Sequence, residues 1–262
     1  MAKFRAARKL WAKLLRERYD VRNNKALFLR GLFGGGGSGL TKEQPENNIM
    51  RGAYYALAAA LGGAQTTALC SFDEAYSIPT ERSTLLSLRT LQILMDEIGL
   101  RDTVDPLAGS YFIETLTKKM EEKILAEMDE IENVGGIVAG ISSGEVQRRV
   151  ARQAYEYERR LQTGEAIKVG VNKYTEGDTK EVELHQYDNS WALRQIDNLK
   201  ALRRTRNNAD VKKTLDALHA ATKQNKNVMP YLVDCCKAYA TVGEMAGVFR
   251  DVFGEFAEPS LF

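Results

Sequence analysis

KALFLRGLFGGGGSGLTKEQPENNIMRGAYYALAAALGGAQTTALCS, residues 25–71, contains the pattern that decides the fold class. Lys25–Phe33 is a short apolar run that predicts a buried strand, and a glycine loop follows it. Pro45–Leu61 is predicted to be a helix, and Ala64–Ser71 is predicted to be a second strand. Because two parallel strands need a helical crossover between them, this stretch predicts a strand–helix–strand unit of an α/β fold.

The same pattern continues along the chain. A helix is predicted over Arg82–Ile98, a third and shorter strand over Asp102–Asp105, and a helix from about Phe112 to Asn133. Thr41 and Ser83 are predicted to cap helices. Parallel strand–helix units leave two architectures, a doubly wound sheet and a (β/α)8 barrel. Three units cannot close a barrel of eight strands, so a barrel would be present only in part.

Strand signals almost stop after Gly136. The remaining helices are predicted over Glu145–Gln162 and near Trp191–Thr205, Asp210–Ala221, Val228–Tyr239 and Val242–Phe253. Glycine and polar residues cluster over Gly164–Lys180, where we place the domain boundary. The sequence therefore predicts a barrel-type α/β domain over residues 1–164 and a helical extension over residues 165–262.

Composition limits the class of protein. The net charge of +2 implies no polyanionic partner such as nucleic acid. Cysteines occur only at 70, 235 and 236, which makes no disulfide framework and predicts a reducing compartment, the cytoplasm. With only two histidines and no Cys-x-x-Cys pair, no metal site is predicted. The apolar stretches are shorter than the roughly 20 residues that span a bilayer, so no membrane partner is expected.

The most conspicuous motif is the glycine loop Gly34–Gly39, which follows a predicted strand. It matches G-x-G-x-x-G, but a run of glycines matches easily and the next helix begins late for a dinucleotide site. It also nearly makes a P-loop, yet the phosphate-binding lysine is absent, which excludes an ordinary nucleotidase. Two interpretations remain: a flexible connection, or a loop whose backbone approaches a large flat cofactor at the carboxyl ends of the strands.

Two further loops follow the other predicted strands. Asp73 and Glu74 could act as acid and base, bind a metal, or simply begin a helix, and helix propensity favours the last reading. Asp105–Tyr111 is rich in turn-forming residues and is predicted at the same edge of the sheet. The three loops together predict a functional face.

In this order and spacing the loops resemble the large, catalytic subunit of the methylmalonyl-CoA mutase family of coenzyme-B12-dependent acyl-CoA mutases. The resemblance spans about residues 2–255 and rests on AKFRAARKLWAKLLRERY, SGLTKEQPENNIMRGAYYALAAALGGAQ, SFDEA, PTERS, VDPLAGSYFIETLT, GVNKY and TVGEM. It implies the C-terminal part of a (β/α)8 TIM-type barrel, with about three parallel strand–helix units, followed by a helical extension.

The resemblance also implies a function. In this family adenosylcobalamin supplies radical chemistry, and the thioester group of an acyl-CoA migrates to the adjacent carbon. The cobalt ligand and the front strands of the barrel are not in this sequence, which implies a separate cobalamin-binding small subunit and a chain that supplies those strands. The isolated chain is expected to be inactive. The alternative is a non-catalytic accessory or remnant chain that binds a mutase partner or a CoA ligand.

Residue by residue, the resemblance assigns Gln65 to the substrate and Glu74 to a ribose hydroxyl of the adenosyl group. The remaining cofactor positions that it implies are Gly37, Ser38, Ala75 and Ser77. Relatives carry histidine and glutamine where this sequence has Leu32 and Gly34, both on the substrate side, and histidine at Ala68. These differences imply a less polar acyl site and a bulkier acyl-CoA than methylmalonyl-CoA. No catalytic residue is assigned within the chain.

Overall fold

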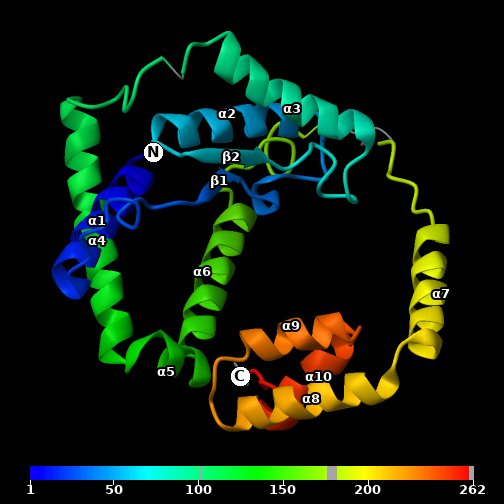
Figure 1. Ribbon diagram of the computed structural model, residues 1–262. Coiled ribbons are helices and arrows are strands. Elements are labelled where there is room, and N and C mark those ends of the chain that lie inside the picture. The colour runs from blue at the N-terminus through cyan, green and yellow to red at the C-terminus, as the bar shows by residue number, and fades with distance from the viewer. Residues whose placement is uncertain (101, 176–181, 260–262) are drawn as a thin grey trace. The chain divides into compact units, whose positions relative to one another are not determined.

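The computed structural model describes residues 1–100, 102–175 and 182–259 (Figure 1). The chain divides into two compact units, the first within Met1–His185 and the second over Gln186–Pro259. Each unit is described by itself. The predicted division into residues 1–164 and 165–262 remains a prediction about domains of the whole protein.

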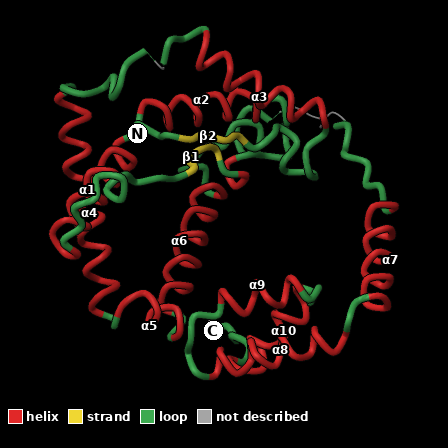
Figure 2. Tube along the Cα trace, viewed as in Figure 1, coloured by secondary structure: helices red, strands yellow, loops and turns green. Residues whose placement is uncertain are grey.

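The first unit contains a parallel strand pair. Strand β1 (Leu32–Gly35) and strand β2 (Thr66–Leu69) pair in register from Leu32 opposite Thr66 to Gly35 opposite Leu69 (yellow in Figure 2). Helix α2 (Asn47–Leu61) connects the strands and packs against both. The predicted helical crossover between parallel strands is therefore confirmed, and the fold is a helix-rich α/β fold with a small parallel sheet. The first predicted strand, Lys25–Phe33, is wrong over most of its length. Lys25–Leu27 form a turn, and β1 begins only at Leu32 and includes Gly34 and Gly35, the first two residues of the predicted glycine loop.

The other helices of this unit carry the strand pair and its loops. Helix α1 packs against α4, α3 packs against α2, and α5 contacts both α4 and α6. Their bounds are α1 Ala2–Tyr19, α3 Glu81–Asp96, α4 Tyr111–Asn133, α5 Gly136–Ser142 and α6 Glu145–Gln162. The predicted helices in this region agree with these bounds to within a few residues at each end.

The two predicted helix caps are wrong. The side chain of Thr80, rather than Ser83, caps α3 by accepting a hydrogen bond from the backbone N–H of Ser83. Thr41 is buried and lies several residues before α2, and its hydroxyl donates to the carbonyl of Glu43. Both errors have one cause. Residues that can cap a helix are common in any sequence, and the path of the backbone decides which of several neighbouring candidates becomes the cap.

The predicted third strand at Asp102–Asp105 is also wrong. These residues form bends, and Asp105 has a positive φ of 50°. Arg5 of α1 donates from Nε and Nη2 to the two carboxylate oxygens of Asp105 at 2.9 and 2.8 Å. Arg5 also donates to Glu114 and Thr117 of α4. These charge-assisted hydrogen bonds hold the segment against α1 in a bent conformation. A strand at this position would have to break them.

The second unit is helical, as predicted. It contains α7 (Ser190–Thr205), α8 (Asn208–Lys223), α9 (Met229–Lys237) and α10 (Val242–Phe253). Its core consists of Leu218, Cys235 and Val248, one residue from each of the last three helices. Helix α10 begins with a capping box in which Thr241 and Glu244 satisfy each other's backbone N–H groups.

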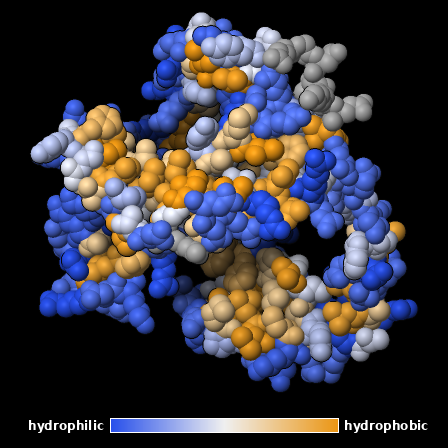
Figure 3. All heavy atoms as spheres, turned by 90° about the horizontal axis from the view of Figure 1, so that it is seen from above, coloured by the Kyte–Doolittle hydropathy of each residue, from blue (hydrophilic) through white to orange (hydrophobic). Residues whose placement is uncertain are grey.

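Apolar side chains reach the surface at many places (orange in Figure 3). In the first unit, α2, β2, α3 and the segment around Val104 border a groove of about 660 Å³. Its apolar lining includes Phe28, Leu88, Met95 and Val104, of which Val104 is 85% exposed. Large exposed apolar surface on a single chain is typical of a face that another element covers. Within the described ranges, no helix is long and apolar enough to cross a membrane.

Candidate functional site

The glycine loop begins where β1 ends. Gly37–Gly39 forms one turn of 3-10 helix, and the chain then turns inward at the buried Leu40 and Thr41. A Cβ atom at Gly39 would lie 2.6 Å from the hydroxyl oxygen of Tyr55, and a Cβ atom at Gly37 would lie 3.1 Å from Cγ of Glu74. The loop therefore needs glycine for close approach to its neighbours, and not only for flexibility.

The second loop follows β2 and begins at Phe72. Asp73 is fully buried, and its Oδ2 accepts a hydrogen bond from the backbone N–H of Thr80 at 3.1 Å. Two backbone N–H groups, those of Tyr76 and Ser77, donate to the Asp73 carbonyl. These contacts fold Phe72–Ser77 into a compact turn. Asp73 is therefore an anchor of the turn. The helix-start reading of this carboxylate is wrong, because α3 begins only at Glu81 and Glu81 is the acidic residue of its first turn.

The two loops meet at the residues that the resemblance assigned to the cofactor. Gly37 lies against the side chain of Glu74, and the Tyr76 hydroxyl donates to the carbonyl of Lys42 at 2.6 Å. Glu74 and Ala75 are exposed, Ser38 is exposed, and Ser77 is half-buried. The structure thus brings the glycine loop and the Phe72–Ser77 loop together at the carboxyl ends of parallel strands, where α/β folds place their sites.

Cys70 lies at this junction and was not singled out as a site residue from the sequence. Burial raises the pKa of its thiol, the charge of Glu74 raises the pKa further, and a hydrogen bond from the Gly37 backbone opposes both effects. The thiol is therefore protonated at neutral pH and behaves as a small apolar group between the loops. Tyr76 belongs to the loop that the sequence predicts as a candidate, although no role was assigned to it. Burial, with the nearby charges of Glu43 and Glu46, raises the pKa of its hydroxyl, which stays a hydrogen-bond donor.

The substrate-side residues line different hollows beside the strand pair. Gly34 lines one of about 270 Å³ and Gln65 lines one of about 660 Å³, and α2 borders both. Leu32 is 66% exposed, and Gly34, Thr66 and Ala68 are exposed with it, so these residues share an open face of the sheet. Gln65 precedes β2 and lines the 660 Å³ groove on the side of α2 and α3. Leu32 and Gly34 therefore lie together, and Gln65 lies apart from them.

Gly34 does not leave empty space where relatives carry a glutamine. A Cβ atom at this position would overlap the backbone carbonyl oxygen of Ala68, its partner in the ladder. The room that the sequence comparison implied at position 34 is filled by the close approach of the two strands. Any gain in acyl space must come from Leu32 and Ala68, which are exposed on the same face.

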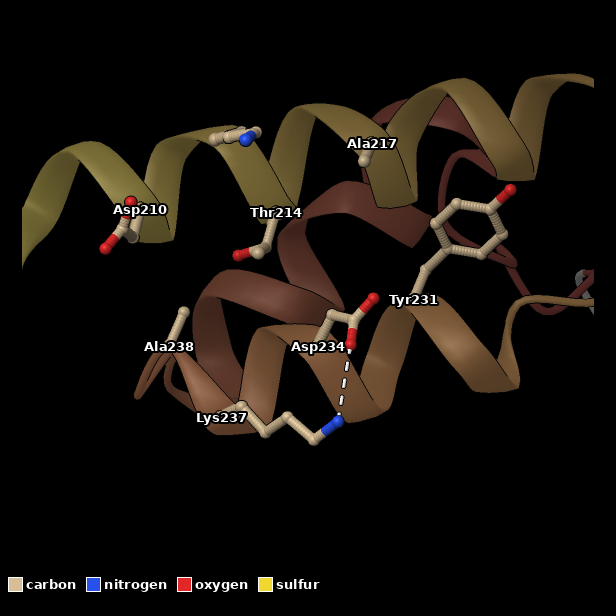
Figure 4. A pocket seen from close by; sticks show the side chains of 8 residues that line it. Asp210, Thr214, Ala217, Tyr231, Asp234, Lys237 and Ala238 are labelled. Carbon is tan, nitrogen blue, oxygen red and sulfur yellow. Dashed lines mark ion pairs between the residues drawn. The ribbon is translucent and has the colours of Figure 1, made fainter.

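The second unit has a hollow of about 460 Å³ between α8 and α9 (Figure 4). Asp210, Thr214 and Tyr231 line it, and the ion pair of Asp234 and Lys237 closes one side at 3.7 Å. None of the residues assigned from the sequence lies here. Its lining mixes charged and apolar side chains and is open to solvent, which is typical of a surface groove rather than a cofactor site.

Over residues 1–100, 102–175 and 182–259, no three His, Cys, Asp or Glu side chains come together as a possible metal centre. The surface formed by the glycine loop and the Phe72–Ser77 loop consequently offers hydrogen-bond acceptors and small residues rather than a metal-binding cluster.

Known proteins resemble the chain over its whole length. The family model described as methylmalonyl-CoA mutase matches residues 1–255. The 2-hydroxyisobutanoyl-CoA mutase large subunit of Aquincola tertiaricarbonis is 39% identical, and the match covers 100% of this chain and 47% of that protein. Human mitochondrial methylmalonyl-CoA mutase is 37% identical over 97% of this chain and 34% of its own length. Methylmalonyl-CoA mutase of Rhizobium meliloti is 36% identical, with 97% and 36% covered.

The chain therefore spans less than half of the length of these curated relatives. The matched range includes both loops of the candidate site and the helical second unit up to α10. Because the family model covers nearly the whole sequence, the chain belongs to the methylmalonyl-CoA mutase family.

Proposed function

We propose that this chain forms part of an adenosylcobalamin-dependent acyl-CoA mutase, an isomerase that moves a thioester group to the adjacent carbon. The observation that carries the proposal is the junction of Gly37 with Glu74, which unites the two family loops at the ends of parallel strands. Enzymes with parallel strands build their sites at this edge. Membership of the family supplies the reaction class.

The residues at the junction fit a large planar cofactor. Alanine at 75 is exposed and presents only a methyl group to a flat ring, and Glu74 presents an exposed carboxylate beside it, with its side chain against Gly37. In this arrangement Glu74 would accept a hydrogen bond from a ribose hydroxyl, while Gly37, Ser38, Ala75 and Ser77 would line the ring. When bound, the cofactor supplies homolytic chemistry for removing a hydrogen atom from the substrate.

The chain's own contribution is positioning and exclusion of water. Asp73 is fully buried and stabilises the turn on which Glu74 lies. Gln65, Leu32 and Gly34 are the proposed substrate-side residues, and the open face with Leu32 and Ala68 is apolar. An apolar surface excludes water from reactive intermediates and buries methylene groups of an acyl chain at about 0.8 kcal/mol each.

This apolar face favours a bulkier or branched acyl-CoA over methylmalonyl-CoA. A carboxylated acyl group would lose charged hydrogen bonds worth roughly 1.5–3 kcal/mol where relatives carry polar side chains. One relative is named for 2-hydroxyisobutanoyl-CoA, a branched and hydroxylated acyl group. That acyl group has no free carboxylate but is no larger than methylmalonyl, so it supports the loss of the carboxylate and not the added bulk. We therefore propose a bulkier acyl-CoA without a free carboxylate as the substrate, in a reaction of the methylmalonyl-CoA/succinyl-CoA type.

In this proposal the complete enzyme includes polypeptide segments beyond this chain, which supply the remaining barrel strands and the cobalt ligand. The exposed face of the two strands and the apolar groove beside Val104 support additional barrel strands that would cover them. The cobalt ligand would come from another domain or from a separate small subunit, and one relative is named a large subunit. The chain alone is expected to be inactive.

The test is reconstitution. The chain is combined with a polypeptide that carries the front barrel strands and with a cobalamin-binding small subunit, and adenosylcobalamin and acyl-CoAs are titrated while the visible spectrum and the products are followed. We expect spectral change and isomerised acyl-CoA only with all parts present. Glu74→Gln should raise the cofactor concentration needed at least tenfold, whereas Glu81→Gln, an exposed acid of α3, should not.

An assembly that binds no adenosylcobalamin, or that turns over no acyl-CoA, would contradict the proposal. Turnover by the 262-residue chain with adenosylcobalamin alone would contradict the need for the other parts. Equal effects of the Glu74 and Glu81 variants would remove the assigned role of Glu74.

A further inference from the structure

We infer that Asn48 is a positioning residue that joins the glycine loop and the Phe72–Ser77 loop into one surface. The inference rests on the proposed function for its meaning in catalysis, but its geometry stands by itself. Asn48 is the second residue of α2 and is 1% exposed, which is unusual for a side chain with four hydrogen-bonding positions.

Every hydrogen-bonding position of the Asn48 amide is used. Its Oδ1 accepts from the backbone N–H of Thr41 at 3.0 Å and from Nη1 of Arg51 at 2.8 Å. Its Nδ2 donates to the carbonyl of Thr41 at 2.8 Å and to the carbonyl of Phe72 at 2.9 Å. A primary amide has two donors and two acceptor positions, so no other uncharged side chain of this size reproduces the set.

The partners are the ends of the two loops. Thr41 is the residue at which the glycine loop turns inward, and Phe72 immediately precedes the anchor Asp73 and Glu74. The two hydrogen bonds to Thr41 fix the orientation of the Thr41 backbone and its distance from Asn48. The hydrogen bond to the Phe72 carbonyl holds the second loop to the same Asn48 amide. One side chain therefore sets where Gly37 and Glu74 lie relative to each other.

Arg51, one helical turn away, extends the junction to a third segment. Its Nη1 donates to the Thr41 hydroxyl at 2.7 Å as well as to Asn48, and its Nη2 donates to the carbonyl of Val169 at 2.6 Å. Val169 immediately precedes GVNKY, residues 170–174, one of the stretches that carry the resemblance. Two matched motifs and the residue before a third thus meet at the first turns of α2.

Helix formation does not explain this asparagine. Helix α2 has no side-chain cap, and the Asn48 amide bonds to the loops instead of to the free N–H groups of its own helix. Its neighbour Asn47 provides a matched comparison, because it has the same side chain in the same turn, is half-buried, and donates to Oε1 of Gln44 at 2.8 Å.

The first experiment compares Asn48→Asp and Asn47→Asp in the full chain by hydrogen–deuterium exchange. Asn48→Asp keeps the shape but removes both donors, so we expect amides in residues 36–41 and 72–77 to exchange at least tenfold faster, while α8 and α10 stay unchanged. Asn47→Asp should leave both loops as in the parent chain. Acceleration of one loop only, or equal acceleration in both variants, overturns the inference.

If Asn48→Asp does not fold, Asn48→Ser decides, since serine keeps a donor and an acceptor on a shorter side chain. It should loosen both loops together, and protection of either loop at the parental level overturns the inference. This measurement needs neither cofactor nor partner, so it is independent of the reconstitution above.

In the assembled protein, a positioning role predicts a split in the kinetic constants. Asn48→Asp should raise the KM for adenosylcobalamin at least tenfold and change the KM for acyl-CoA by less than twofold, with Asn47→Asp close to the parent. Equal rises in both constants indicate general loss of structure and overturn the positioning role. If the parent assembly binds no cofactor, the proposed function fails, and the exchange experiment alone decides the role of Asn48.

Discussion

The second unit and the β1–α2–β2–α3 region of the first unit bury different kinds of residue. Helices α8, α9 and α10 close around Leu218, Cys235 and Val248. In the strand–helix region several of the best-buried side chains are polar: Thr41, Asn48, Ser71, Asp73 and Ser83. Apolar contacts favour burial without fixing direction, whereas a satisfied buried hydrogen bond fixes a distance and an angle.

The buried residues of the two regions therefore have different structural roles. The helical unit is stabilised mainly by apolar packing and by local helix signals, and it has no assigned site residue. The strand–helix region uses buried polar groups to hold two loops that the backbone alone would leave free, and it leaves apolar surface exposed. Substitutions should therefore change stability in one region and loop geometry in the other.

The largest effect is expected in the helical core. Leu218 has no exposed surface, so Leu218→Ala should destabilise the second unit by about 2–5 kcal/mol. The exposed Leu193 of α7 is the control, and Leu193→Ala should cost less than about 0.5 kcal/mol. Denaturation followed by exchange in α8–α10 measures both. If Leu218→Ala also loosens residues 36–41 and 72–77, the two regions are not independent and the comparison fails.

A smaller effect is expected in the strand pair. Gly34→Ala places a Cβ atom against the carbonyl oxygen of Ala68, so the ladder must separate, at a cost of about 1–3 kcal/mol. Gly36→Ala is the control, since only the side chain of Ser38 comes within 4.0 Å of its Cβ position. Exchange at the amides of β2 reports the separation. Equal protection in both variants would show that the close approach of the strands is not needed.

A local cap should contribute less again. Thr241→Ala removes the capping box of α10 and should cost about 1 kcal/mol, seen as a lower melting temperature of the second unit. Thr205→Ala is a suitable control, because the Thr205 hydroxyl donates only to carbonyls of its own helix α7. A change in the glycine loop on Thr241→Ala would contradict the division between the two regions.

A pH-dependent effect is expected from an ion pair of the second unit. The hydrogen bonds from Arg206, with those from Thr241, lower the pKa of Glu244 from 4.5 to about 2. The carboxylate is favoured in the folded state, so its contribution to stability is complete above about pH 4.5 and is lost as the pH falls through about 2. Thermal melting of the parent and Glu244→Gln chains at pH 7, 4 and 2 should converge at the lowest pH. A constant difference across this range would exclude the ion pair as the cause.

Much of the local structure could be read from the sequence. The apolar periodicity of α2, α4, α8 and α10 predicts their ranges closely, and the strand–helix–strand order predicts the parallel pairing, although β1 lies several residues later than the predicted run Lys25–Phe33. The motifs that identified the family are contiguous stretches of sequence, so the resemblance was also visible there and the family match confirms it. These features are local, because a helix or strand period repeats within a few residues.

The tertiary structure decided what depends on distant partners. Arg5 and Asp105 are 100 residues apart, and their hydrogen bonds replaced the predicted third strand by a bend. Asn48 and Phe72 are 24 residues apart, and no period in the sequence marks this asparagine as different from Asn47. Gln65 and Gly34 carry one predicted role but line different hollows. A side chain's period predicts which face it occupies on its own element, while its hydrogen-bond partner is set only when the elements assemble.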